Sequence, residues 1–211
     1  MVEKLRLAYF PVPKCACSSA KNVLYELSHG EPYVNRSADK KMHIHKVYPT
    51  GNGFDENNWL WSDSNNYAKI CIVREPIDRL RSAYTNRVLF HNEINPAAVR
   101  HASIDHLPHK PTFEEFAVNL FEYQHIPSIR HHTLPITHYL GEDSSRFDKV
   151  FNVSCMESFY SYLDNRSGCC VTRFHRQNGG QEIDVEPLSL KTRFQITSYY
   201  HKDYTVFGEF F

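Results

Sequence analysis

Residues 5–21 read LRLAYFPVPKCACSSAK, and this stretch decides the fold class of the 211-residue chain. Leu5–Val12 is a short apolar run with aromatic residues, which predicts a buried β-strand. Residues 18–27 predict a helix that begins at a serine N-cap, either Ser18 or Ser19. A strand, a short loop and a helix in immediate succession are typical of the repeating unit of an α/β protein.

The rest of the chain continues this alternation of short strands and longer helices. Further strands are expected at residues 42–48, 69–74 and 149–153. Helices are expected from Pro76, from the capping boxes at Thr112 and Ser154, and over residues 187–201. Irregular connections are expected at residues 49–66, 91–111 and 125–146. We therefore predict an α/β fold of one domain over residues 1–211, with a central parallel sheet flanked by helices and phosphate-binding loops at the carboxyl ends of its strands.

The charge balance argues against a binder of nucleic acid. Lysine and arginine number 24, aspartate and glutamate also number 24, and the formal net charge is zero, whereas a general polyanion binder carries a basic excess. Hydrophobic residues make up 41% of the chain, which is enough for a buried core. No apolar run has the length of a transmembrane helix, and the first residues do not form a signal peptide. If the chain is complete, it is expected in the cytoplasm.

Several common site motifs are missing from the sequence. It contains no G-x-G-x-x-G, no G-x-x-x-x-G-K-[ST], no G-x-S-x-G and no H-E-x-x-H. This excludes the usual dinucleotide fingerprint, the Walker loop and two hydrolase classes in their standard forms. The six cysteines are too sparse for a disulfide scaffold and lack zinc-finger spacing, so we expect no metal.

The loop after the first strand carries groups that suit a phosphate. A lysine offers a positive charge, two serines offer hydroxyl groups, and the N–H groups at a helix N-terminus attract anions. The predicted cofactor-binding residues of this loop are Lys14, Cys15, Ala16, Cys17, Ser18 and Ser19. The alternative is an ordinary turn with a surface lysine and a serine cap.

A second candidate phosphate site follows the strand at residues 69–74. Arg74 ends this strand, and Ser82 lies two turns into the helix behind Pro76, so the two side chains together can hold a phosphate group. The alternative is a capped helix with scattered surface arginines.

The third candidate is the histidine pair His43 and His45. Alternate residues of a strand face the same way, so both imidazoles can point into one cleft. A neutral imidazole is a suitable base for a hydroxyl group near pH 7, and we favour His45 for this role. The alternatives are substrate positioning, an ordinary pair of polar strand residues, and a metal-binding pair.

Together, residues 13–19 and 73–84 resemble the two cofactor motifs of sulfotransferases that use 3′-phosphoadenosine 5′-phosphosulfate (PAPS). The likeness is greatest to the carbohydrate branch, which includes the uronyl 2-O-sulfotransferases and the chondroitin and HNK-1 types. The resemblance implies that the first loop binds the phosphosulfate, with Lys14 stabilising the leaving oxygen. It also implies that Arg74 and Ser82 bind the 3′-phosphate and that a basic loop with Arg176 closes over the adenosine.

Looser likeness extends over residues 113–116, 132–140, 147–157 and 200–208. The cysteines at positions 15 and 17 depart from the family pattern, in which small or β-branched residues often stand there. The H-x-H at His43 and His45 resembles the histidines that supply the base in uronyl 2-O-sulfotransferases.

The resemblance implies in-line transfer of a sulfuryl group to a hydroxyl group, expected on a carbohydrate acceptor, without a metal ion. Two alternatives are a degenerate relative that binds nucleotide or glycan without turnover, and a P-loop-type kinase. A bacterial-type cytoplasmic enzyme and a Golgi domain cut from its anchor both fit the resemblance. The identity of the acceptor and the oligomeric state stay open.

Overall fold

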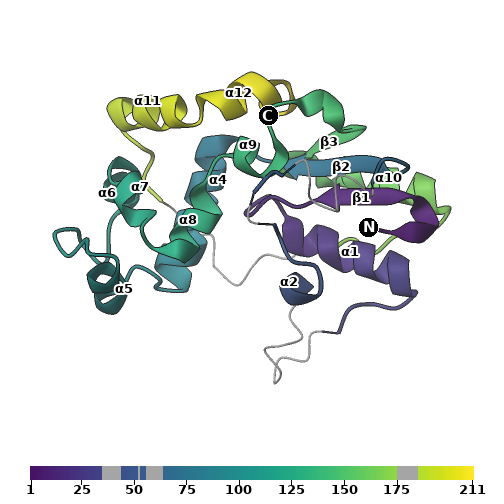
Figure 1. Ribbon diagram of the computed structural model, residues 1–211, viewed down its shortest axis with the longest axis horizontal. Helices are drawn as coiled ribbons and strands as arrows, with labels where there is room; N and C mark the ends of the chain where they lie inside the picture. The colour runs from purple at the N-terminus through teal and green to yellow at the C-terminus, as the bar shows by residue number, and fades with distance from the viewer. Residues whose placement is uncertain (35–43, 52, 56–63, 175–184) are drawn as a thin grey trace. The chain divides into compact units, whose positions relative to one another are not determined.

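A computed structural model describes residues 1–34, 44–51, 53–55, 64–174 and 185–211 of the chain (Figure 1). The chain divides into two compact units. The first unit comprises Met1–Arg74, Ile136–Arg176 and Val206–Phe211, and the second comprises Glu75–Pro135 and Gln177–Thr205. The predicted single domain stays a prediction, and each unit is described separately below.

The first unit contains a three-stranded sheet in which all neighbouring strands run parallel (Figure 1). Its strands, in the order β1-β2-β3, are β1 (Leu7–Phe10), β2 (Ala68–Val73) and β3 (Lys149–Asn152). This confirms the predicted α/β class with a parallel sheet. Because the strands are parallel, their carboxyl ends at Phe10, Val73 and Asn152 lie along one edge of the sheet.

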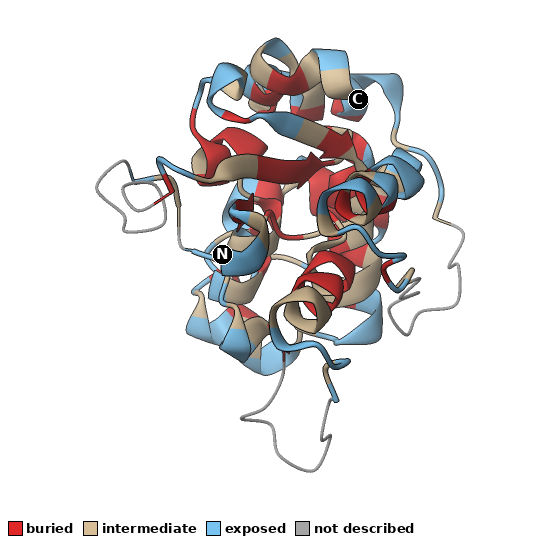
Figure 2. Cartoon of the chain, turned by 90° about the vertical axis from the view of Figure 1, so that its right-hand side faces the viewer, coloured by how far each residue is buried: buried red, intermediate tan, exposed pale blue. Residues whose placement is uncertain are grey.

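Both faces of β1, and of β2 from Ile70 onward, are buried. The residues of one face form a core cluster with apolar side chains of α1 (Cys17–His29) and α10 (Met156–Ser167). On the other face, Phe10 packs edge-on against Phe147 with ring centroids 5.5 Å apart. Parallel strands that are covered on both faces appear as continuous apolar runs in the sequence. Figure 2 accordingly shows these strands mainly in red, whereas the helices carry red on one side and blue on the other.

Helix α1 begins earlier than predicted and without a serine cap. Its N-cap is Ala16, which has a left-handed conformation with φ of 51° and makes no side-chain cap hydrogen bond. Lys14 is also left-handed, with φ of 67°. These two residues turn the chain sharply from β1 into α1, so the predicted N-cap at Ser18 or Ser19 is wrong, because both serines lie inside the first helical turn.

The strand expected at residues 42–48 is wrong over its described part. Ile44–Val47 forms the short helix α2, in which Tyr48 N–H donates to the Ile44 carbonyl at 2.9 Å. The side chain of Ile44 is buried, and α2 contacts α1. The short apolar–polar alternation of this segment therefore reflects the burial of Ile44 in a helix and not the face of a strand.

The second unit is helical among its described residues. Its elements are α4 (Pro76–Ala83), the π-helix Tyr84–Phe90, α5 (Pro96–His101), α6 (Phe113–Val118), α7 (Leu120–Tyr123), α8 (Pro127–Thr133) and α11 (Leu190–Tyr199). Two predicted helix starts are confirmed, because Pro76 occupies the first turn of α4 and Thr112 forms a capping box with Glu115. A core of side chains from α4, α6, α7, α8 and α11 holds this unit together.

Some element boundaries differ from the predictions. The capping box at Ser154 does not form, because α10 begins at Met156 and the Ser154 hydroxyl donates to Asn152 Oδ1 instead. The single helix expected over residues 187–201 is divided into α11 and α12 (His201–Phe207). The stretches predicted to be irregular contain α5, α8 and α9 (Ile136–Leu140). Among the described residues, 3₁₀ turns are found at Glu3–Leu5, Ser144–Arg146, Val153–Cys155 and Gly208–Phe210. Within the described parts of the chain, no helix is both long and apolar enough to cross a membrane.

Because the N-cap of α1 is left-handed, replacing alanine by glycine is predicted to stabilise the protein at position 16 and to destabilise it at position 20. Ala16→Gly should raise the free energy of unfolding by about 0.5–1 kcal/mol, since glycine adopts the left-handed conformation without steric cost. Ala20→Gly, in the interior of α1, should lower it by about 1 kcal/mol, because glycine weakens a helix. Urea unfolding of both variants tests this, and equal destabilisation by the two substitutions would contradict it.

Candidate active site

The loop between β1 and α1 lies at the carboxyl edge of the sheet. Lys14 in this loop is half-buried, and so are Ala16, Cys17 and Ser18. The Cys15 thiol is completely buried, and its backbone N–H donates to the Val12 carbonyl at 3.2 Å. The loop thus turns its cysteine side chain at position 15 inward and leads directly into the N-terminus of α1.

His45 joins the loop to helix α2 through a hydrogen-bonded cluster. Its Nε2 atom lies 2.8 Å from Ser18 Oγ, and its Nδ1 atom lies 3.0 Å from Lys21 Nζ. The Lys21 ammonium also donates to Thr50 Oγ1 at 2.8 Å. The structure therefore brings together the predicted residues Ser18 and His45. It adds Lys21 and Thr50, which the sequence analysis did not select.

Lys21 is an unusual member of this cluster because its charged side chain is only 2% exposed. It stands beside Ala20 and Val23, which are fully buried on the core side of α1. Burial lowers the pKa of Lys21 from 10.5 to about 8, and the nearby Cys17 opposes this change. A lysine among the apolar positions of an amphipathic helix was the signal that could have identified it.

Arg74 follows β2 at the same edge of the sheet as the loop after β1, as predicted, and it is half-buried. Ser82 lies in α4 of the second unit and is also half-buried. His43 and Arg176 lie outside the described residues. Arg173, which begins the same basic segment as Arg176, forms ion pairs with Asp164 at 2.6 Å and Glu157 at 2.9 Å.

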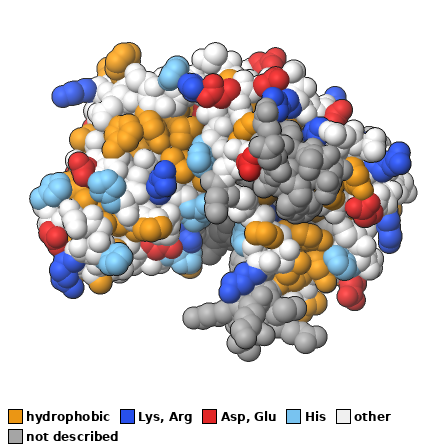
Figure 3. Space-filling view, in the orientation of Figure 1, with side chains coloured by type: hydrophobic (Ala, Val, Ile, Leu, Met, Phe, Trp, Pro, Cys, Tyr) orange, Lys and Arg blue, Asp and Glu red, His pale blue; other side chains and the backbone are white. Residues whose placement is uncertain are grey.

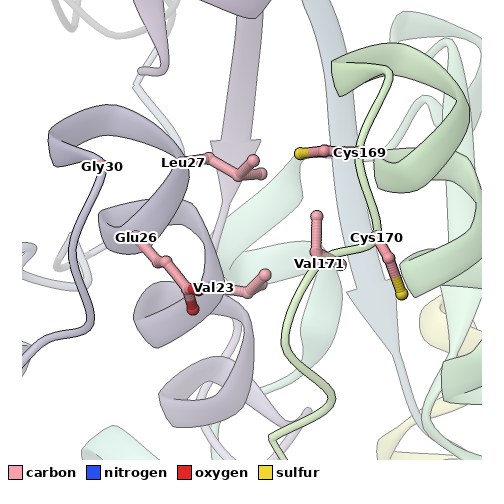
Figure 4. A pocket seen from close by; sticks show the side chains of 7 residues that line it. All are labelled: Val23, Glu26, Leu27, Gly30, Cys169, Cys170 and Val171. Carbon is pink, nitrogen blue, oxygen red and sulfur yellow. The ribbon is translucent and has the colours of Figure 1, made fainter.

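A small cavity lies beside the C-terminal half of α1 (Figure 4). It is lined by Val23, Glu26, Leu27, Gly30, Cys169, Cys170 and Val171. Helix α1 runs away from the carboxyl edge of the sheet, so this cavity lies toward the opposite edge. Among the described residues that line it there is no lysine, arginine or histidine.

On one face of the molecule, the surface charge of the described residues is mixed. On the face shown in Figure 3, basic and acidic side chains of the described residues alternate instead of forming one basic area. Over the described ranges, no group of three or more His, Cys, Asp and Glu side chains is arranged to hold a metal ion. The cationic Lys21 at His45 Nδ1 also disfavours a metal ion on that atom.

In α/β proteins, ligands bind at the carboxyl ends of parallel strands, and the loop after β1, the His45 cluster and Arg74 all lie there. The chain is thus an α/β protein with a polar site at the edge where this class carries out its chemistry. Comparison with protein families shows the family to which the chain belongs. The model of the sulfotransferase family matches residues 1–210, and the chain therefore belongs to the sulfotransferase family.

A curated relative matches part of the chain. Carbohydrate sulfotransferase 11 from Danio rerio is 37% identical to this chain over 90 residues. The match covers 40% of this chain and 24% of that relative, so the chain matches about a quarter of the relative's length. No solved structure matches the chain.

The buried Lys21 predicts how stability changes with pH. Its pKa is lowered in the folded protein, so the unfolded chain binds more protons between pH 8 and 10.5 and stability rises with pH over that interval. Relative to Lys21→Met, the wild-type free energy of unfolding should increase by about 3 kcal/mol across it.

Urea unfolding at several pH values between 7 and 10.5 measures this difference. Lys46→Met is the matched control, because Lys46 is an exposed lysine of α2 next to His45. If the difference in free energy of unfolding between wild type and Lys21→Met stays constant across this interval, then burial does not destabilise the Lys21 ammonium.

Proposed function

We propose that this sulfotransferase moves a sulfuryl group from PAPS to a hydroxyl group of a carbohydrate. The observation that carries the proposal is the 2.8 Å contact between Ser18 of the loop after β1 and His45. It joins a candidate phosphosulfate-binding loop to a candidate base. Membership of the family supports PAPS as the sulfuryl donor, and the name of the relative from Danio rerio supports a carbohydrate acceptor.

The residues of the first unit fit the anionic groups of PAPS. Lys14 supplies a positive charge, Ser18 and Ser19 supply hydroxyl groups, and the 13-residue helix α1 points its N-terminus at the loop. The backbone of residues 15–17 completes the proposed phosphosulfate site. Arg74 at the end of β2 is proposed to bind the 3′-phosphate, with Ser82 and Arg176 as further contacts that the sequence resemblance implies.

The proposed reaction is an in-line displacement at sulfur. The acceptor oxygen forms a bond to sulfur while the bond from sulfur to the 5′-phosphate oxygen breaks, and 3′-phosphoadenosine 5′-phosphate (PAP) leaves with the electron pair. His45 accepts the proton of the acceptor hydroxyl, with His43 as the alternative base. Lys14 stabilises the negative charge that develops on the leaving oxygen. As in phosphoryl transfer, positioning and electrostatics supply most of the rate.

Calorimetric titration with PAP tests the proposed nucleotide site. Wild type should bind PAP with a micromolar dissociation constant and bind ATP, which lacks a 3′-phosphate, at least tenfold more weakly. Arg74→Ala should weaken PAP binding by about 10- to 100-fold, since a charge-assisted hydrogen bond is worth about 1.5–3 kcal/mol. Equal affinity for PAP and ATP would favour the kinase alternative, and no binding of either would remove the proposed site.

Transfer of labelled sulfate from PAPS to a panel of desulfated chondroitin and desulfated heparan chains tests the reaction. Lys14→Ala should lower kcat at least 100-fold, because it removes charge stabilisation of the leaving group. His45→Gln should lower kcat by a factor of about 10²–10⁴, the usual contribution of a general base. Lys4→Ala, at an exposed lysine before β1, should leave kcat unchanged. A wild-type chain that binds PAP but labels no acceptor would instead support the non-catalytic alternative.

A further inference from the structure

The hydrogen bonds of His45 with Lys21 and Ser18 restrict which ring nitrogen carries a proton. A protonated lysine has only donors, so Lys21 in its ammonium form must donate to His45 Nδ1, which lies 3.0 Å away. Nδ1 then uses its lone pair, and the neutral ring carries its proton on Nε2. That proton is donated to Ser18 Oγ at 2.8 Å.

This arrangement decides whether His45 can accept a proton from a substrate hydroxyl. With Lys21 charged, both nitrogens of the neutral imidazole are engaged, and neither offers a lone pair to a substrate hydroxyl. With Lys21 as a neutral amine, Nζ can accept a hydrogen bond. The ring can then carry its proton on Nδ1, and the lone pair of Nε2 can accept a hydrogen bond from the hydroxyl of Ser18 or from that of the acceptor.

We propose that Lys21 is a positioning residue that fixes the tautomer of His45 and so sets the pH above which His45 can remove a proton from the acceptor. Its catalytic consequence rests on the proposed function of His45, whereas the control of the tautomer does not. Lys21 acts through His45 and not on substrate, because its own side chain is only 2% exposed.

The proton balance of the step follows from this geometry. The acceptor O–H bond breaks and an Nε2–H bond forms on His45. At the same time the Nδ1–H bond breaks and the proton passes to the Lys21 amine, which becomes an ammonium. The imidazole is neutral before and after the step, and Thr50 Oγ1 is placed to accept a hydrogen bond from the new ammonium at 2.8 Å.

The groups that act on Lys21 come from two helices and one connecting segment. His45 approaches from α2, Thr50 follows α2, and Cys17 precedes Lys21 by one turn of α1. Burial has the largest effect and lowers the pKa of Lys21 to about 8. The amine form is therefore accessible at mildly alkaline pH, and the transition between the two His45 tautomers is expected there.

The test is ¹⁵N NMR of the ligand-free protein with labelled histidine, with the His45 signals assigned by their loss in His45→Gln. In wild type, Nε2 should carry the proton at pH 7, and the Nδ1-protonated fraction should rise with a midpoint near pH 8. Lys21→Arg, which cannot become neutral in this range, should keep the proton on Nε2 throughout. Lys21→Met should abolish the transition near pH 8, and Lys46→Met should retain it.

An unchanged tautomer from pH 6.5 to 9.5 in wild type, or the same transition in Lys21→Met, would overturn the proposal. The wild-type titration alone decides this point, so a variant that fails to fold does not remove the test.

The pH profile of sulfate transfer gives the second readout. In wild type kcat should rise through about pH 8, whereas Lys21→Arg should be at least tenfold slower than wild type at pH 9. In Lys21→Met the rise should move toward the ordinary histidine pKa of about 6.5. A purely structural role of Lys21 would lower kcat at every pH and leave the midpoint in place.

The two proposals fail in different ways. If PAP binding is absent, or His45→Gln retains full activity, the proposed function fails while the NMR transition still reports on Lys21. If His45→Gln is inactive but the midpoint in Lys21→Met equals that of wild type, the role of His45 stands and that of Lys21 fails.

Discussion

The parallel pairing of β1 with β2 is the constraint on which the rest of the first unit depends. Parallel neighbours cannot be joined by a tight turn, so the chain between them must cross over one face of the sheet. Here that crossover contains α1 and α2, and α1 covers the sheet with Ala20, Val23 and Leu24. The same pairing brings the loop after β1 and Arg74 after β2 to one edge. The candidate site is therefore a consequence of strand direction before any single side chain is considered.

Within that crossover, a buried cation fixes the arrangement of the polar side chains. An ammonium group removed from water is costly unless hydrogen bonds replace its hydration. Lys21 obtains such bonds from His45 and Thr50, which follow α1 in the chain and are held by α2 and the segment behind it. His45 is in turn connected to Ser18, on the same face of α1 as Lys21. The cluster thus couples the position of α2 to the loop, and it does so with the same side chains that are proposed to exchange protons.

The sequence predicted those features whose causes are local. The dense apolar run of β2 and the proline at position 76 were enough to place a strand and a helix start, and Thr112 with Glu115 marked a capping box correctly. The left-handed conformations of Lys14 and Ala16 were not visible, since neither residue is glycine. His45 was selected for its chemistry but placed on a strand, because Ile44 is buried by a tertiary contact that short-range alternation does not reveal. Lys21 was missed because a lysine is ordinarily exposed, and its partners lie far along the chain.

The chain path between the two units has a consequence for how the protein folds. It passes from one unit to the other after Arg74, after Pro135, after Arg176 and after Thr205, so neither unit is a continuous segment. Residues Val206–Phe211 return to the first unit, where the Phe210 carbonyl accepts a hydrogen bond from the side chain of Asn152 at the end of β3. A nascent chain therefore cannot complete the first unit until residues 206–211 have been synthesised. Neither unit can be separated from the other by a single proteolytic cut.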